Sequence, residues 1–151
     1  MTKRIPRIYV DSTAVGGKFN KRFAEQTKTF WDAFTRGEFI VIISDILEQE
    51  AVPAPQRVRD FLGSLPESQI ERVTSTSESD NLAVWYVAKR VVDESCLNDC
   101  RHIALATIAG ADAIVSWNMK HMVKRSDGYN SVNESLGYPC VPIKTPENFM
   151  R

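Results

Sequence analysis

The segment spanning residues 99–121 constrains the fold of this chain more than any other. Asn98-Asp99 is a helix-start signal, and the residues that follow form an almost wholly apolar helix pattern. Gly110 stands where a helix C-terminus favours a residue that tolerates a left-handed backbone. The apolar triplet at residues 113–115 then suits a buried parallel strand, and the polar residues 116–118 follow it directly. This order predicts an α/β protein with a site at the carboxyl edge of its sheet.

The rest of the chain continues the alternation of apolar strands with helices. We predict strands at residues 7–10, 39–43, 70–74 and 141–143, helices at residues 18–36, 46–50, 56–65 and 82–92, and a helical turn at residues 145–147. Residues 124–137 are polar, and we expect an irregular or partly helical segment there. Alternating elements favour a three-layer α/β/α sandwich with a mainly parallel central sheet, folded as a single domain over residues 1–151.

Composition narrows the class of protein. The chain is 43% hydrophobic and 25% charged, which is typical of globular proteins. Its formal net charge of +0 argues against non-specific coating of nucleic acid, although it is compatible with a local basic face. No apolar run approaches the roughly 20 residues that a membrane span needs. Met1-Thr2-Lys3-Arg4 leads directly into a strand rather than a signal peptide, so we expect a cytoplasmic protein without membrane contact.

The cysteines indicate a reducing compartment. Their number is three, which does not suit a disulfide framework. Cys96 and Cys100 have helical i, i+4 spacing with His102 nearby, so a zinc site has to be considered. The spacing matches none of the usual zinc patterns, and Cys140 is distant in sequence. Buried structural cysteines are the favoured interpretation.

Three acidic residues occupy similar places in the predicted elements. Asp11 follows the first strand, Glu50 lies in the helix after the second strand, and Asp99 lies in the first turn of a later helix. Glu50 shares its helix face with apolar residues, whereas Glu48 points elsewhere and is expected to be solvated. If the sheet brings the three acids together, they form a site for a hard divalent cation. Each acid also has a simpler reading as a turn or capping residue, and sequence periodicity does not decide between the two.

The chain resembles the PIN domain family, the ribonuclease fold best known from VapC-like toxins of bacterial and archaeal toxin–antitoxin pairs. The resemblance lies in Tyr9-Val10-Asp11-Ser12, in Ser44 to Glu50, in Asp99 to Ala104 running through Gly110-Ala111-Asp112 to Ser116 to His121, and in Gly137-Tyr138-Pro139 and Ile143 to Glu147. It therefore spans nearly the whole chain, and the third of these motifs is the specific one.

The resemblance implies a Mg²⁺- or Mn²⁺-dependent endoribonuclease. Asp11 and Asp99 would be metal-binding acids, and Glu50 would complete the acidic cluster. Ser12 and Ser116 would lie beside the site and donate hydrogen bonds to carboxylates or to phosphate. The implied partners are RNA as substrate, a small antitoxin protein and a second copy of the chain in a homodimer.

One position departs from the family pattern. Many PIN nucleases carry a fourth acid where this chain has Asn118. Asn118 stays a candidate catalytic residue, because its carbonyl can hold a water or a metal, but it adds no charge and should weaken metal affinity. Lys120 and His121 are candidates for phosphate contact, although His121 is equally well read as a loop histidine with a local partner. Trp117 would either stack on an RNA base or cover the edge of the sheet.

Three functions follow, in order of preference. The first is a ribonuclease in which metal-activated water attacks an RNA phosphodiester, acting as the toxin of a toxin–antitoxin pair. The second is a PIN-like module that binds RNA or protein with weak or no catalysis, because the fourth acid is missing. The third is a phosphoacceptor switch that uses Asp11.

Overall fold

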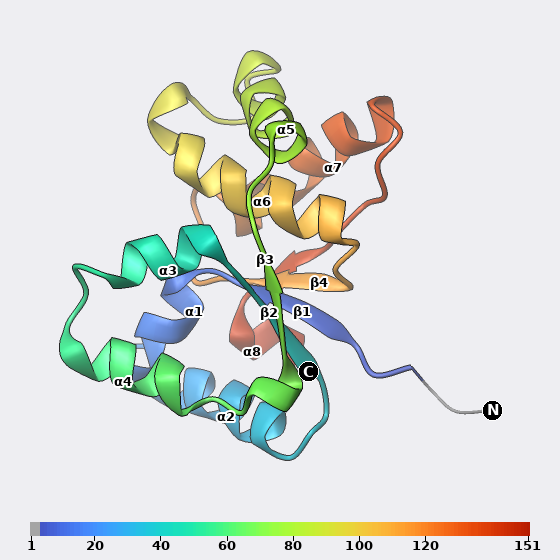
Figure 1. The fold of residues 1–151 in the computed structure, drawn as a ribbon. Helices are drawn as coiled ribbons and strands as arrows, with labels where there is room; N and C mark the ends of the chain where they lie inside the picture. Colours follow the sequence, from blue (N-terminus) through green and yellow to red (C-terminus); the bar gives the residue numbers. More distant parts are fainter. Residues whose placement is uncertain (1–3) are drawn as a thin grey trace.

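The computed structural model describes residues 4–151, so the expectation about Met1 to Lys3 lies outside the described residues. Within this range, five strands form one parallel sheet in the order β3-β2-β1-β4-β5 (Figure 1). The strands are β1 (Arg7–Val10), β2 (Ile40–Ser44), β3 (Ile70–Val73), β4 (Ala113–Val115) and β5 (Ile143–Lys144). The three inner strands β1, β2 and β4 are apolar, partly β-branched and mostly buried, as central parallel strands require, whereas the edge strands β3 and β5 are partly exposed.

Helices cover both faces of the sheet and connect the strands. They are α1 (Ser12–Gly16), α2 (Ala24–Thr35), α3 (Asp45–Ala51), α4 (Gln56–Ser64), α5 (Ser77–Ala88), α6 (Leu97–Ala109), α7 (Ser126–Ser135) and α8 (Pro146–Phe149), with 3₁₀ turns η1 (Gly17–Phe19), η2 (Glu67–Gln69), η3 (Glu94–Cys96) and η4 (Val123–Arg125). In Figure 1, α5, α6 and α7 lie on one face and α1, α2, α4 and α8 on the other. The predicted three-layer α/β/α fold is therefore confirmed.

Each face of the sheet has its own hydrophobic core, because successive residues of a strand point to opposite faces. Tyr9 and Ile114 belong to the cluster beneath α5, α6 and α7. Ile8 and Val10 belong to the cluster that packs against α2, where Phe30 is fully buried. Residues of β1 belong to both clusters, and β1 is the middle strand of the sheet.

The strand order places the site. From β1 the chain adds β2 and β3 on one side, and then returns to add β4 and β5 on the other. The order therefore reverses between β1 and β4, where ligand sites of open α/β sheets form at the carboxyl ends of the strands. Val10 pairs with Val115 in register, so Asp11 and Ser116 emerge side by side at this edge.

The predicted helix over residues 18–36 is wrong in its first half. Asp11 caps α1 by accepting from the backbone N–H of Ala14, so helical structure begins at Ser12 and breaks after η1. The long helix α2 starts only at Ala24 and ends before Gly37, whose φ is +82°. Phe19 and Phe23 consequently lie outside α2.

Three other predicted boundaries also need correction. The capping box of Thr76 and Ser79 starts α5 at Ser77, well before the predicted residue 82. Strand β5 is Ile143–Lys144 rather than residues 141–143, whereas α6 starts at Leu97 with Asp99 in its first turn, as predicted. The polar segment 124–137 is mostly the regular helix α7, which buries Tyr129 and Val132 against the core.

Candidate active site

Asp11 is held firmly at the end of β1. Its Oδ1 accepts from the Thr13 hydroxyl at 2.7 Å and from the Ala14 backbone N–H at 3.1 Å. Its Oδ2 accepts from the Ser116 hydroxyl at 2.6 Å. The side chain is 3% exposed. Since an ionised carboxylate has about four lone-pair sites, three bonds leave room on Oδ2 for a further positive partner.

The hydroxyl of Ser116 therefore donates its hydrogen bond to the Asp11 carboxylate and is not free for a phosphate. Ser116 is fully buried after β4, and its Oγ also accepts from the Asn118 backbone N–H at 2.9 Å. Of the two roles that the sequence left open, the geometry agrees with the hydrogen bond to Asp11. Ser116 thus joins the ends of the two strands that meet at the reversal of strand order.

Asp99 lies half-buried near Asp11, on the first turn of α6. Burial raises the pKa of Asp99, the neighbouring Asn118 amide opposes this, and the negative charge of Asp11 raises the pKa further. Asn118 Oδ1 accepts from the His121 backbone N–H at 3.1 Å, which fixes the direction of its amide. Two carboxylates that repel each other in this way form a site that favours a cation.

Glu50 is engaged by a histidine that the sequence reading did not assign to the site. The Oε1 atom of Glu50 lies 2.6 Å from His102 Nε2, and Oε2 accepts from the Asn98 amide at 2.8 Å. Burial acts to raise the pKa of Glu50, but hydrogen bonds from His102 and Asn98 hold it below its usual value. The sequence showed His102 only as a neighbour of two cysteines.

The Glu50–His102 contact belongs to a buried chain of hydrogen bonds. The Tyr9 hydroxyl donates to Ser44 Oγ at 2.8 Å and lies 2.6 Å from His102 Nδ1. Ser44 also accepts from the Leu47 backbone N–H, which starts α3. The two ring nitrogens of His102 thus engage Tyr9 and Glu50 together. The chain of contacts links β1, β2, α3 and α6 beneath the carboxyl edge.

Because the pKa of Glu50 is lowered, the contribution of this residue to the stability of the folded protein depends on pH. The stabilising effect of its carboxylate is present above the unfolded-state pKa and is lost as the pH falls through the lower folded-state pKa. The Glu50→Gln variant should therefore melt below the wild type at pH 7, and the gap should close in acid. Thermal unfolding followed at pH 7, 5, 4 and 3 measures this gap. A gap that is the same at every pH would contradict the assignment.

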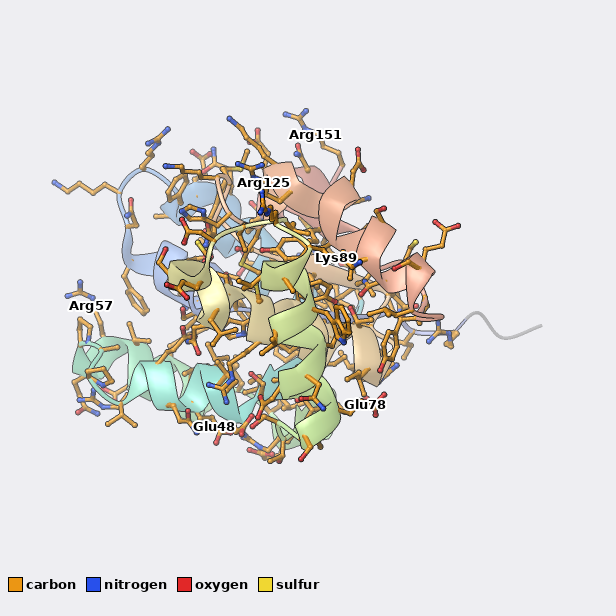
Figure 2. All side chains as sticks on the ribbon, turned by 90° about the horizontal axis from the view of Figure 1, so that it is seen from above. Glu48, Arg57, Glu78, Lys89, Arg125 and Arg151 are labelled. Carbon is orange, nitrogen blue, oxygen red and sulfur yellow. The ribbon has the colours of Figure 1, made fainter. Side chains whose placement is uncertain are left out.

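The remaining predicted residues lie around this edge. Ser12 is half-buried and close to Glu50, and both line a pocket of about 320 Å³ between α1, α3 and α4. Arg57 stands on the outer side of this pocket (Figure 2). Lys120 is exposed, and His121 is half-buried. Ser12 and Arg57 therefore lie on the Glu50 side of the site, and the charge of His121 acts on Asp99 from the other.

Trp117 covers the edge of the sheet instead of presenting a free face. Its ring stacks on Phe23 with centroids 4.2 Å apart, and its Nε1 donates to Thr27 Oγ1 at 2.8 Å. A Cβ at Gly17 would come within 2.8 Å of the same ring, so this packing needs a glycine there. Phe23 therefore covers one face of the Trp117 ring, as the sheet-covering role requires.

The donor set suits a hard, hydrated cation. In the part of the chain that the structure describes, no three His, Cys, Asp or Glu side chains form a ready metal-binding group. Mg²⁺, however, is usually held by one or two carboxylates and keeps several waters. Asp11 and Asp99 match that requirement, whereas Glu50 is committed to His102 and Asn98. The metal assignment therefore stays a prediction, with Asp11 and Asp99 as its best-placed ligands.

The cysteines are all free, as their number indicated. Cys96 and Cys100 are buried, and burial raises the pKa of the Cys100 thiol to about 12. A protonated, buried thiol is a poor zinc ligand. Cys140 is exposed.

Acidic side chains at the carboxyl edge of a five-stranded parallel sheet, flanked by helices on both faces, define a PIN-like α/β fold. No family model matches the sequence, and no curated protein matches it. Among solved structures, the fold is similar to Mycobacterium tuberculosis VapC20, a Sarcin-Ricin loop cleaving toxin, with a TM-score of 0.58 and 13% identity over 76% of this chain and 92% of that one.

It is also similar to the structure of VapBC2 from Rickettsia felis bound to a DNA fragment from their promoter. That match has a TM-score of 0.57 and 12% identity, and it covers 92% of this chain and 98% of that one. The structural similarity to VapC toxins confirms the PIN-like fold predicted from the sequence. At identities this low, the likeness shows the fold alone.

No helix within residues 4–151 is both long and apolar enough to cross a membrane.

Proposed function

We propose that this chain is a metal-dependent endoribonuclease that hydrolyses RNA phosphodiester bonds at the carboxyl edge of β1 and β4. Asp11 and Asp99 would hold Mg²⁺ or Mn²⁺, and Glu50 would complete the acidic cluster. One observation supports this best: Asp11 at the end of β1 and Asp99 on the first turn of α6 come from separate elements, yet both lie at the carboxyl edge where the strand order reverses, and burial together with the charge of Asp11 raises the pKa of Asp99. Two carboxylates kept in mutual repulsion beside an open edge favour cation binding over structural use.

The chain's own residues have distinct tasks in this proposal. Thr13 and Ser116 donate hydrogen bonds to the two oxygens of Asp11, so this carboxylate is already oriented for the cation. Asn118 orients Asp99, and Lys120 is free to contact a phosphate oxygen of the substrate. A bound Mg²⁺ would lower the pKa of a coordinated water and neutralise charge that develops on the phosphate.

Glu50 acts in this proposal through its charge and its position. Its carboxylate contacts His102 Nε2, and the other ring nitrogen of His102 contacts the Tyr9 hydroxyl on the central strand β1. Ser12 lies beside it at the mouth of the 320 Å³ pocket, where it would meet substrate. Glu50 and His102 are positioning residues that keep α3 and α6 in place around the site.

The proposed biological role follows from the fold. Because the structure is similar to VapC toxins, we propose that the chain is the toxin of a toxin–antitoxin pair. A small antitoxin protein and a second copy of the chain would be its partners, and the cytoplasm its compartment.

A PIN-like binding module with weak or no catalysis is the second candidate. It is favoured by the engagement of Glu50 with His102 and by the neutral Asn118 beside Asp99. Such a module would bind RNA or protein without needing a cation.

Titration with Mn²⁺ distinguishes the two candidates. Calorimetry of the purified protein should show saturable Mn²⁺ binding that Asp11→Asn and Asp99→Asn weaken strongly. Glu48→Gln is the matched control, because Glu48 is exposed and pairs with Arg72. Wild-type protein should also cleave a mixed RNA pool with Mg²⁺ and fail with EDTA. Absence of both saturable binding and cleavage would leave the binding module as the function.

A further inference from the structure

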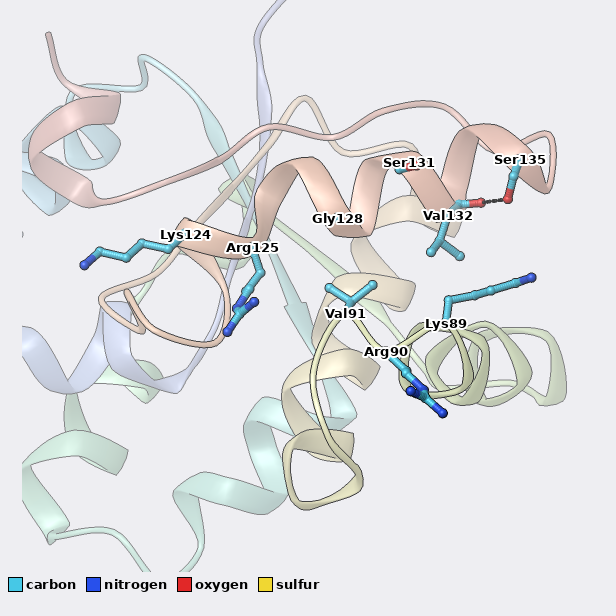
Figure 3. A pocket seen from close by; sticks show the side chains of 9 residues that line it. All are labelled: Lys89, Arg90, Val91, Lys124, Arg125, Gly128, Ser131, Val132 and Ser135. Atoms are coloured by element: carbon cyan, nitrogen blue, oxygen red, sulfur yellow. Dashed lines mark hydrogen bonds between the residues drawn. The ribbon is translucent and has the colours of Figure 1, made fainter.

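A basic groove lies outside the candidate site, between the segment that follows α5 and the first turns of α7. Its volume is about 540 Å³, and Val91 packs toward Gly128 along its floor (Figure 3). A Cβ at Gly128 would come 3.0 Å from a methyl group of Val91, so the two segments lie in close contact at this point. The groove is thus a built feature of the fold.

The groove carries cations without counterions. Lys89, Arg90, Lys124 and Arg125 line it, and all four are exposed. Among residues 4–151, none of the four is in an ion pair, and the lining contains no carboxylate. Elsewhere on the surface, cations such as Arg36 do pair with acids. In a protein of zero formal net charge, this is a local concentration of positive potential.

Arg90 occupies a backbone position that normally belongs to glycine. Its φ is +63°, the only positive value of a non-glycine residue in the part of the chain that the structure describes. Side chains other than Asn, Asp and Gly are disfavoured in this region by contact of Cβ with the backbone. Arg90 directly follows the C-cap residue of α5, where a left-handed backbone ends many helices, and its side chain points out of the loop beside the groove.

The arrangement of the cations suits a strand rather than a single phosphate. In Figure 3, Lys124 and Lys89 point away from each other at opposite ends of the groove, and Arg125 and Arg90 lie between them on opposite segments. Figure 2 likewise separates Arg125 from Lys89, and it places Arg57 on a different part of the molecule. Charges spread along a line match successive phosphates of an extended polyanion.

The groove continues toward the candidate active site. Arg90 and Arg125 also line an adjoining pocket of about 380 Å³ together with Asp93. Ser95 holds the pKa of Asp93 below its usual value, and Lys120 and His121 lower it further, so those two residues lie nearby. His121 binds Asn118 through its backbone N–H. A mixed path of cationic and anionic groups, which includes the Asp93 carboxylate, therefore joins the groove to the acidic site.

We propose that this basic groove binds the phosphodiester backbone of the RNA substrate, at a distance from the bond that is cleaved. The proposal rests on the proposed function, since it assigns RNA as the occupant. The groove would add affinity without reading bases, because its cations contact phosphate and its floor is apolar and small. Lys120 would then continue the row of cations to the reacting phosphate.

The test measures RNA binding apart from cleavage. All proteins carry Asp99→Asn, all solutions contain EDTA, and the probe is a fluorescein-labelled single-stranded RNA of about 20 nucleotides. The groove variant combines Arg90→Gly, Lys124→Gln and Arg125→Gln. The control variant combines Lys28→Gln, Arg36→Gln and Arg151→Gln, which removes the same charge from positions paired with acids.

Fluorescence anisotropy should show at least about a tenfold weaker Kd for the groove variant, and no comparable loss for the control. The slope of log K against log salt should fall by about 2, since each phosphate contact of a single strand contributes roughly 0.7. Arg90→Gly alone should melt at the same temperature as its parent or higher, because glycine accepts a positive φ. This separates loss of charge from loss of folding.

Equal RNA affinity and equal salt slope in the groove variant would overturn the proposal and leave an acidic protein segment as the occupant. The result is independent of the proposed nuclease activity. A groove variant that loses RNA binding, in a protein whose wild type does not cleave, would refute the nuclease and keep the groove. If the wild type cleaves RNA and the groove variant binds RNA normally, the groove proposal is refuted and the nuclease proposal is kept.

Discussion

Asp99→Asn is expected to abolish Mg²⁺-dependent RNA cleavage, with a loss in rate of at least about 100-fold. The site offers two well-placed carboxylates, so this change removes half of the negative charge that would hold the cation. The initial rate of cleavage at saturating Mg²⁺ measures the effect. Glu48→Gln removes the same charge from an exposed position and should cleave like the wild type.

The same change should leave the fold intact. The folded-state pKa of Asp99 is raised, so its carboxylate destabilises the folded protein at every pH above its unfolded pKa. A neutral amide removes this penalty, and the melting temperature near pH 7 should stay level or rise. Full activity in Asp99→Asn would refute the metal assignment, and a large fall in melting temperature would refute the electrostatic reading.

Asp11→Asn should lose activity equally but at some cost in stability. Asparagine still caps a helix, so the bond from the Ala14 backbone N–H can persist. Its amide nitrogen, however, would face the Ser116 hydroxyl that now donates to Oδ2. One of those two groups then has to turn away from its present partner.

His102→Ala is expected to cause the largest loss of stability. The ring is buried between Tyr9 and Glu50, and its removal leaves a buried hydroxyl and a partly buried carboxylate without their partner. We expect a loss of about 3 kcal/mol in the free energy of unfolding. For a chain of this size, that corresponds to a fall of roughly 6–12 °C in melting temperature, measured by calorimetry or circular dichroism.

Arg101→Ala is the matched control on the same helix. Arg101 is partly exposed and its ion pair with Asp80 is 3.3 Å long, so its loss should cost less than about 1 kcal/mol. If His102→Ala and Arg101→Ala melt alike, the buried hydrogen-bond chain does not stabilise the fold as described.

The strands were predictable because their signal is local. Segments 7–10 and 113–115 are short, apolar and flanked by polar residues, and both strands have the predicted bounds. Gly110 ends α6 in the left-handed conformation, with φ of +70°, as its place after an apolar helix indicated. Ser44 caps α3 and Thr145 caps α8 for the same local reason.

The parts that could not be predicted depend on contacts distant in sequence. His102 joins Tyr9 and Glu50, which are separated from it by 93 and 52 residues. Asp112 likewise accepts from the Arg7 backbone N–H at the start of β1, 105 residues away. The hydrophobic periodicity of a sequence does not encode such contacts, so only the three-dimensional structure shows them.

The break between α1 and α2 has a similar cause. Local pattern joined residues 18–36 into one helix because four phenylalanines share helical spacing. Phe23 instead stacks on Trp117, which arrives from the loop after β4. A tertiary contact therefore overrides the local preference at this point.

A crystal of this protein soaked in Mn²⁺ tests the central claim most directly. Anomalous scattering should reveal one manganese ion between the carboxylates of Asp11 and Asp99, at oxygen–metal distances of about 2.0–2.3 Å. Its absence at saturating Mn²⁺, or a full-occupancy ion bound away from both residues, would contradict the proposed nuclease.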